Sequence, residues 1–192
     1  MDIFYIHGFG SRYNPDSDKI RGLGRLGAVR GADYDYTATF DSIIAHLTRE
    51  TQRADLLVGT SLGGYLAMRL GTLTCRPYIA INPAIDPATS LRAYLGPGTD
   101  HYGTDFVMEE ATLRSYPPLL PGLAPERGLV LIDEGDEVID VPATIEMAGL
   151  AGLRHFTFPG GDHRFQHMEE ALPLIEEHLD CIAALTPRET QQ

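Results

Sequence analysis

The sequence predicts an α/β fold in which helices cover both faces of a mostly parallel central sheet of about six strands. Three observations predict it. Short apolar runs alternate with segments whose apolar residues recur at helical spacing, as expected for parallel strands joined by crossover helices. One apolar run ends in a serine flanked by glycines, where a helix is expected to begin. The last two runs are each followed by a short loop rich in glycine and acidic residues.

Six segments are predicted strands. Five are clear, because each is a short run of mostly apolar, β-branched or aromatic residues bounded by turn-forming residues. These are residues 2–6, 56–60, 77–82, 129–133 and 154–158, and a weaker strand is predicted at residues 27–31.

Four helices are predicted between and after these strands, at residues 41–53, 62–73, 142–150 and 168–184. Asp41 is expected to cap the first of them. Pro142 suits the first turn of the third, where its missing N–H costs nothing. The fourth is long and amphipathic, with apolar residues along one side.

The interval from about residue 86 to 127 interrupts this alternation. It is rich in Pro, Gly and Tyr and is too long for a simple loop. We expect one domain over residues 1–192, with an insertion at 86–127 that carries a helix or two and is placed to lie over a functional site.

Composition restricts the partners. The 192 residues include 15 Lys and Arg against 27 Asp and Glu, a net charge of −12 that disfavours nucleic acid and favours a neutral small-molecule substrate. No signal-peptide or membrane-spanning stretch is present, so a cytoplasmic protein is expected. Cys75 and Cys181 are expected to be free thiols. The polar residues 186–192 are expected to fray, and nothing indicates the oligomeric state.

Ser61 is the candidate nucleophile. Gly59-Thr60-Ser61-Leu62-Gly63 reads G-x-S-x-G between a predicted buried strand and a predicted helix, the context of a nucleophile elbow in the α/β-hydrolase fold. The sharp turn exposes the serine hydroxyl, and it leaves no room for side chains two residues before or after it. The alternative is a glycine-rich turn without chemistry.

His163 and Asp136 are the candidate base and acid. In this fold the triad follows the order Ser, acid, His along the chain, and each partner lies beyond the end of a later strand. His163 follows the predicted strand 154–158, and Asp136 follows the strand 129–133. Asp133, Glu137 and Asp140 are rivals for the acid.

Two other polar residues in and after the loop of His163, Asp162 and His167, suggest other possible roles. Asp162, beside the histidine, is expected to anchor its loop rather than to act as the acid. His163 and His167 are four residues apart, but no third ligand with suitable spacing is evident, so neither a metal nor another cofactor is expected.

The oxyanion would be held by two backbone N–H groups, those of Phe9 and Leu62. Leu62 follows the nucleophile, and Phe9 lies in the loop after the first strand. Gly8 lets this backbone approach the substrate. His7 is expected to brace the loop by hydrogen bonds, with a role as the catalytic base as the alternative.

Four residues are candidate substrate contacts: Tyr65, Tyr102, Phe106 and Met108. Tyr65 follows the elbow, and the other three lie in the insertion. Plain packing is the alternative for all four, and for Tyr65 a role in the helix core is equally favoured.

With these residues in hand, the chain resembles the YqiA/YcfP-like small esterases of the α/β-hydrolase superfamily. The resemblance rests on YIHGFGS (5–11), VGTSLGGYLA (58–67), INPAIDP (81–87), LRAYLG (91–96), DEGDEV (133–138) and PGGDHRF (159–165). Residues 12–40 and 97–127 match only loosely.

The resemblance implies a lidless or thinly lidded hydrolase of short-chain or aromatic carboxylic esters, with Ser61, Asp136 and His163 as its triad. The expected chemistry is acyl transfer through an acyl-enzyme intermediate. The alternatives are a thioesterase or other acyl hydrolase with the same triad, a peptidase or acyltransferase, and a non-catalytic binding protein.

Overall fold

Six strands form the central sheet of the computed structural model, which describes residues 1–185. Their order is β2-β1-β3-β4-β7-β8, and every adjacent pair is parallel. The strands are β1 (Asp2–Ile6), β2 (Ala28–Gly31), β3 (Leu56–Thr60), β4 (Tyr78–Ile81), β7 (Gly128–Asp133) and β8 (Arg154–Phe158). All six predicted strands are therefore confirmed, including the weak one. The expectation for residues 186–192 lies outside the described residues.

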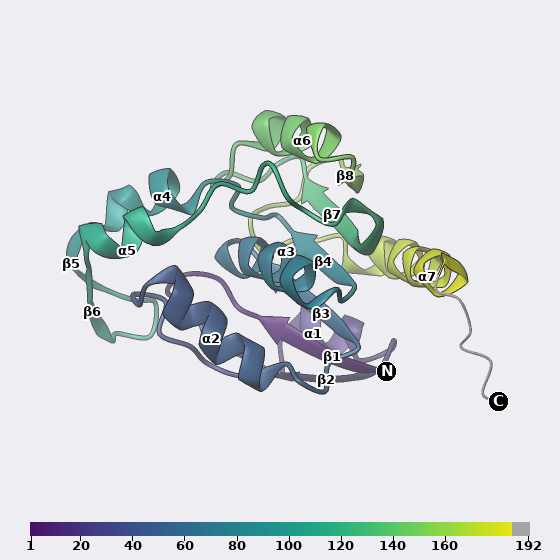
Figure 1. Cartoon of the computed structure of the whole chain (residues 1–192), viewed down its shortest axis with the longest axis horizontal. Coiled ribbons are helices and arrows are strands. Elements are labelled where there is room, and N and C mark those ends of the chain that lie inside the picture. Colours follow the sequence, from purple (N-terminus) through teal and green to yellow (C-terminus); the bar gives the residue numbers. More distant parts are fainter. Residues whose placement is uncertain (186–192) are drawn as a thin grey trace.

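Helices cover both faces of the sheet (Figure 1). One face carries α2 (Phe40–Glu50), α3 (Leu62–Thr74) and α6 (Val141–Leu150), and the other carries α1 (Asp18–Leu23) and α7 (Met168–Leu185). The strands supply both cores because alternate residues point to opposite faces: Phe4 packs toward α2 and α3, whereas Ile3 packs toward α1 and α7.

The helix boundaries correct two expectations. Helix α2 begins at Phe40 with Thr39 as its N-cap, so Asp41 lies inside the first turn, and the helix ends at Glu50 instead of Arg53. Asp41 still has a favourable place there, because a carboxylate near a helix N-terminus interacts well with the helix dipole. Helix α1 was not predicted; it is six residues long and is capped by the side chain of Ser17.

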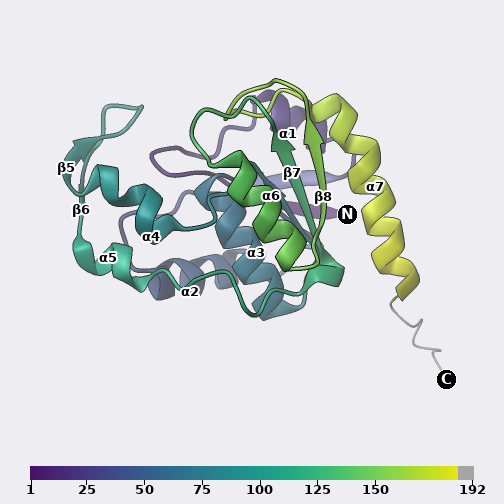
Figure 2. The ribbon, with the colours of Figure 1, turned by 90° about the horizontal axis from the view of Figure 1, so that it is seen from above.

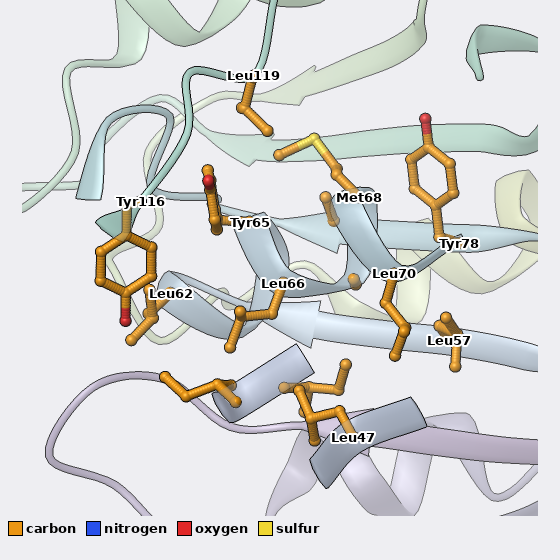
Figure 3. Packing of buried hydrophobic residues seen from close by; sticks show 14 of the residues in the cluster. Leu47, Leu57, Leu62, Tyr65, Leu66, Met68, Leu70, Tyr78, Tyr116 and Leu119 are labelled. Atoms are coloured by element: carbon orange, nitrogen blue, oxygen red, sulfur yellow. The ribbon is translucent and has the colours of Figure 1, made fainter. Parts of the chain in front are cut away.

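The core on the α3 side is continuous from the sheet to the surface helices (Figure 3). Leu62, Leu66 and Leu70 of α3 are buried between the sheet and α2. Each buried leucine side chain contributes about 1.5–3 kcal/mol to folding, which is why this helix is held firmly behind the turn that precedes it.

The segment between β4 and β7 contains short helices, as expected, and also a β-hairpin, which was not predicted. Its elements are α4 (Pro87–Ser90), η1 (Leu91–Tyr94), β5 (Gly96–Thr99), β6 (Asp105–Met108), α5 (Glu110–Ser115) and η2 (Pro125–Arg127). The hairpin is antiparallel and stands apart from the main sheet (Figure 2). Because its strands are four residues each with exposed faces, they carry little of the hydrophobic signal that marks a buried strand.

Two further observations concern the surface. Cys75 and Cys181 are exposed and form no disulfide, as expected. None of the helices in the described part of the chain is both long enough and apolar enough to cross a membrane.

Candidate active site

Ser61 lies on a sharp turn between β3 and α3. Its backbone has φ 58° and ψ −123°, a conformation rarely adopted by residues other than glycine. The flanking glycines are required by space. A Cβ on Gly59 would lie 1.9 Å from the carbonyl oxygen of Gly63, and one on Gly63 would lie 2.1 Å from that of Ile6. The G-x-S-x-G spacing is therefore a steric necessity of this turn.

The loop after β1 passes directly over this turn. A Cβ on Gly8 would lie 3.2 Å from Ser61 Cβ and 3.7 Å from its Oγ. Within residues 1–185 the N–H of Phe9 has no hydrogen-bond acceptor. Leu62 is the first residue of α3, where backbone N–H groups have no acceptor inside the helix. Two backbone donors are thus available near Ser61. The N–H of Leu62 belongs to the next residue in the chain, and the N–H of Phe9 belongs to the loop that passes over the turn.

His7 braces this loop through contacts with Gly8 and Tyr34. Its Nδ1 is 2.9 Å from the carbonyl oxygen of Gly8, and its ring stacks on Tyr34 with centroids 4.4 Å apart. The Tyr34 hydroxyl donates a hydrogen bond to the carbonyl of His7. Burial lowers the pKa of His7 and so favours its neutral form. These contacts fit the expected structural role.

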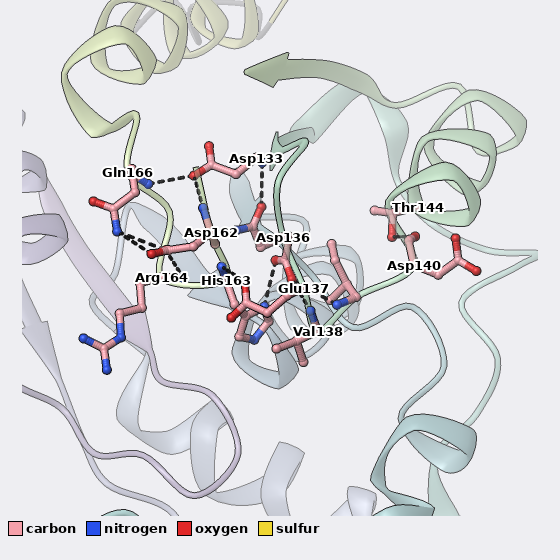
Figure 4. A network of polar contacts seen from close by, with 12 residues as sticks. Asp133, Asp136, Glu137, Val138, Asp140, Thr144, Asp162, His163, Arg164 and Gln166 are labelled. Carbon is pink, nitrogen blue, oxygen red and sulfur yellow. Dashed lines mark hydrogen bonds and ion pairs between the residues drawn. The ribbon is translucent and has the colours of Figure 1, made fainter. Parts of the chain in front are cut away.

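Asp136 and His163 form a direct hydrogen bond. His163 Nδ1 lies 2.7 Å from Asp136 Oδ2, although the two residues come from the separate loops that follow β7 and β8 (Figure 4). The other carboxylate oxygen of Asp136 accepts hydrogen bonds from the N–H groups of Val138 and Ile139. The carboxylate is thus fully engaged and fixed in direction.

The charge state of this pair follows from its surroundings. Burial alone would raise the pKa of Asp136, but the hydrogen bonds from His163 and from two backbone N–H groups outweigh it and hold the pKa below its usual value. The carboxylate is ionised at neutral pH and can only accept hydrogen bonds. When the His163 ring is neutral, its proton therefore lies on Nδ1, and the lone pair of Nε2 is available.

A second carboxylate, Asp133, anchors the loop that carries His163. It is fully buried at the end of β7. Its Oδ2 accepts hydrogen bonds from the backbone N–H groups of Asp162 and Gln166, and its Oδ1 lies 2.7 Å from His167 Nδ1. Figure 4 shows Asp133 with Asp162 and Gln166 around it at the end of the strand. Asp133 thus binds the loop on both sides of His163.

Sequence reasoning missed this anchor, and it also missed Asn82. Asn82, directly after β4, is fully buried with φ 41°. Its side-chain oxygen accepts a hydrogen bond from the N–H of Asp133, and its amide nitrogen donates to the carbonyl of Asp162. The available signal was a carboxylate and an amide at the ends of fully apolar strands, since buried polar groups require partners.

The remaining acidic residues have other partners. Asp140 caps α6 by accepting a hydrogen bond from the N–H of Ala143, and Glu137 accepts one from the N–H of His163. Asp162 accepts hydrogen bonds from Arg164 N–H and Gln166, as expected for a residue that anchors the loop. No group of three or more His, Cys, Asp or Glu residues within 1–185 could hold a metal ion.

The four candidate substrate contacts separate into two pairs. Tyr65 is fully buried, its hydroxyl donates to the carbonyl of Pro117, and Met108 is 1% exposed in the same core. Both positions favour packing over substrate contact, because neither side chain reaches the surface. Tyr102 is exposed on the hairpin, and Phe106 is partly buried.

Phe106 belongs to an aromatic cluster around the candidate oxyanion loop. The ring of Phe9 contacts Tyr36, Tyr94 and Phe106 with centroids 4.9, 4.7 and 5.5 Å apart. Tyr94 and Phe106 come from the insertion. The insertion therefore packs on the side chain of the residue whose N–H is left available beside Ser61.

Comparisons with known proteins give a family and a fold. The model of an uncharacterised protein family, UPF0227, matches residues 2–180. A UPF0227 protein of Shewanella sp. strain ANA-3 is 26% identical over 187 residues, which cover 91% of this chain and 97% of that protein.

Solved structures share the architecture. Est1E from Butyrivibrio proteoclasticus superposes with a TM-score of 0.72 at 17% identity, covering 95% of this chain and 88% of that one, and a second structure of Est1E holds ferulic acid. A monoacylglycerol lipase of Paleococcus ferrophilus has a TM-score of 0.66 at 15% identity, over 95% of this chain and 94% of that one. The fold is therefore that of the α/β-hydrolases, as the sequence predicts.

Proposed function

The chain belongs to the UPF0227 family and has the α/β-hydrolase fold, and on this basis we propose that it is a serine esterase that uses Ser61, Asp136 and His163 as a catalytic triad. The observation that supports the proposal most directly is the 2.7 Å hydrogen bond between His163 and the buried carboxylate of Asp136. It supplies an oriented base at the same edge of the sheet as the Ser61 turn, and the Nε2 of this base has no hydrogen-bond partner within residues 1–185.

The proposed reaction has two steps. His163 Nε2 takes the proton of the Ser61 hydroxyl as its oxygen attacks the ester carbonyl, and the same nitrogen then protonates the leaving alcohol. Water next attacks the acyl-enzyme, again with His163 as the base. The ionised Asp136 stabilises the imidazolium that forms in each step.

Two backbone donors are proposed to hold the oxyanion, namely the N–H groups of Phe9 and Leu62. Each such donor is worth about 3 kcal/mol, or two to three decades in rate. The proposal gives Gly8 a role as well, since any side chain there would press on Ser61.

The proposed substrate is a carboxylic ester with a short or aromatic acyl group. The ferulic acid bound by Est1E, which shares the fold, supports an aromatic acyl group. The ring cluster around Phe9 offers aromatic surface on the loop that passes over Ser61. Thioesters react through the same triad and belong in the substrate panel.

The test combines covalent labelling with hydrolysis. A fluorophosphonate probe should label the wild type and not Ser61→Ala, and a panel of p-nitrophenyl esters and thioesters of graded acyl length should show turnover that Ser61→Ala and His163→Ala abolish. Ser42→Ala, on the exposed surface of α2, is the matched control and should retain labelling. A folded wild type that neither labels nor turns over any ester would instead support a binding protein.

A further inference from the structure

A large cavity lies beside the candidate active site, on the face of the sheet covered by α1 and α7. Its volume is about 830 Å³. The walls come from the loop after β1, from α1, and from the segment that joins β8 to α7, with Tyr102 of the hairpin at one side. The proposed catalytic residues Ser61, Asp136 and His163 are not among its lining residues.

The charge of this cavity is opposite to that of the molecule. The whole chain has 15 basic residues against 27 acidic ones. The cavity is lined by five basic residues and three acidic ones: Arg12, Lys19, Arg21, Arg25 and Arg164 against Asp16, Asp18 and Glu169. One third of all basic side chains thus gather around one cavity in an acidic protein.

The three acidic residues do not neutralise all of these cations. Arg21 pairs with Asp18, and Arg25 pairs with Glu169. Both pairs are exposed, so they are structural contacts of modest strength. Three basic residues of the lining, Lys19, Arg164 and Arg12, are outside these two pairs.

Lys19 is the only lysine in the chain. Its Nζ donates a 2.7 Å hydrogen bond to the backbone carbonyl of Arg164, and no carboxylate within residues 1–185 lies at ion-pair distance. Burial lowers its pKa to about 8. The negative charges of Asp162, Asp133 and Asp136 only partly offset this effect. A partly buried ammonium of this kind would be stabilised by an anion.

Arg164 and Arg12 complete this wall. The guanidinium of Arg164 has no hydrogen bond or ion pair in the described part of the chain, and Figure 4 shows it directed away from the Asp133 network. Arg12 lies 3.9 Å from Asp100, donates to Thr104 and sits over the ring of Tyr102. Each guanidinium keeps donors in excess of its contacts.

The cavity is linked to the candidate site through its lining residues. Arg164 directly follows His163 in the chain. Tyr5 lines the cavity, and its hydroxyl donates a 2.9 Å hydrogen bond to Thr60, the residue before Ser61. A ligand in the cavity would therefore touch Arg164, the residue after the proposed base, and Tyr5, which is hydrogen-bonded to the residue before the proposed nucleophile.

We infer that this cavity binds a small molecule through an oxyanion of two or more charges, a phosphate or polycarboxylate group, with Lys19 and Arg164 as its main cationic ligands. Guanidinium and ammonium groups are the side chains that bind such oxyanions by charge-assisted hydrogen bonds. The oxyanion can belong to a free ligand or to the substrate of the proposed esterase, and the two sources differ in what they do to turnover.

The binding test needs no enzymatic activity. Inorganic pyrophosphate is titrated into the full chain by calorimetry, and the expected result is binding that Lys19→Met and Arg164→Gln each weaken by about tenfold or more. Arg154→Gln is the matched control, because Arg154 lies at the far end of β8 and pairs with Glu177. It removes one positive charge without touching the cavity.

A second readout uses the single lysine. Pyrophosphate should protect Lys19 from an amine-reactive reagent, as read by mass spectrometry of the peptide that contains it, while the terminal amine of Met1 serves as an internal reference. Equal pyrophosphate affinity of wild type and Lys19→Met would overturn the inference, as would equal weakening by Arg154→Gln. Circular dichroism of each variant verifies its fold.

The source of the oxyanion is separated by kinetics, and this arm alone depends on the proposed esterase activity. Two aryl esters are compared, one with a phosphate on its alcohol and one neutral. If the substrate supplies the oxyanion, Lys19→Met raises KM for the charged ester only. If a free ligand supplies it, pyrophosphate alters the turnover of the neutral ester in the wild type and not in Lys19→Met.

Discussion

At the scale of single residues, the site depends on side chains and backbone held in costly states. Ser61 has a positive φ in a sharp turn, and this turn is possible only because residues 59 and 63 are glycines. Asp136 and Asp133 are carboxylates with fully buried side chains, each satisfied by several hydrogen bonds. Such states persist only where the surrounding structure over-determines them, and they gather at functional sites.

The strain at Ser61 predicts a gain in stability when it is relieved. Ser61→Gly should unfold with a free energy about 1 kcal/mol higher than that of Ser61→Ala, because glycine adopts φ 58° without a Cβ penalty whereas alanine keeps the strain. Urea unfolding of the two variants measures the difference.

The matched pair for this experiment is at Ser42, in the regular helix α2. There glycine should be less stable than alanine by about 1 kcal/mol, so the sign reverses. If glycine were also the less stable residue at position 61, the turn would hold no strain worth relieving.

The different contacts of Asp136 and Asp140 predict that only one of the two carboxylates matters for kcat. Asp136→Asn should lower kcat by several decades, about 10⁴-fold in comparable triads, because the amide no longer fixes the Nδ1–H tautomer of His163. Asp140→Asn should leave ester hydrolysis nearly unchanged, since asparagine caps helices as well as aspartate does. Steady-state hydrolysis of a p-nitrophenyl ester decides between the two, and the reverse order would transfer the role of the acid to Asp140.

At the scale of elements, the sequence predicts those whose side chains are buried and periodic. Strands β1, β3, β7 and β8 appear within one residue of their expected bounds, because an apolar run ended by a turn residue has one good structural solution. The hairpin β5–β6 was missed, since exposed strands show neither pattern. Likewise, Asp133 and Asn82 were missed as anchors because their partners, in the loop after β8, are distant in the chain.

The hairpin is predicted to support the oxyanion loop. Phe106→Ala removes a ring that packs on Phe9, so the proposed Phe9 N–H donor should be less firmly placed. We expect kcat to fall about tenfold, a part of the two to three decades that a whole donor is worth. Val107→Ala, one residue along on the exposed face of the same strand, should leave kcat unchanged.

The same experiment separates positioning from substrate contact. If Phe106 touches the acyl group instead, its truncation should raise KM for aromatic esters and spare short aliphatic ones. A change in KM without a change in kcat would therefore contradict the prediction that the hairpin positions the Phe9 loop.

At the scale of the whole molecule, buried tyrosines make stability sensitive to alkaline pH. Burial raises the pKa of both Tyr5 and Tyr78 to about 12, and it raises that of Tyr34 well above its usual value. In the unfolded chain these phenols ionise near pH 10. The folded state therefore holds protons that the unfolded state releases between these pH values.

The sign follows from this proton balance. Stability should be fully present below about pH 10 and should fall as pH rises toward about 12, by roughly 1.4 kcal/mol per pH unit for each tyrosine involved. Melting temperature against pH measures the effect. Tyr78→Phe should flatten the loss, whereas Tyr102→Phe, on an exposed ring, should not. A melting temperature that is constant to pH 11 would contradict the prediction.

The connection between β4 and β7 has a consequence for how such a protein can diversify. These strands are direct neighbours in the sheet, with Ile81 opposite Leu131. The chain segment that connects them therefore leaves the sheet after β4 and re-enters it at the next strand position. This stretch can lengthen, shorten or be exchanged for a foreign segment without altering the order of any strand. Grafting at this junction offers a way to retarget the scaffold to new molecules while the proposed catalytic residues, which lie on other connections, keep their places on the strand ends.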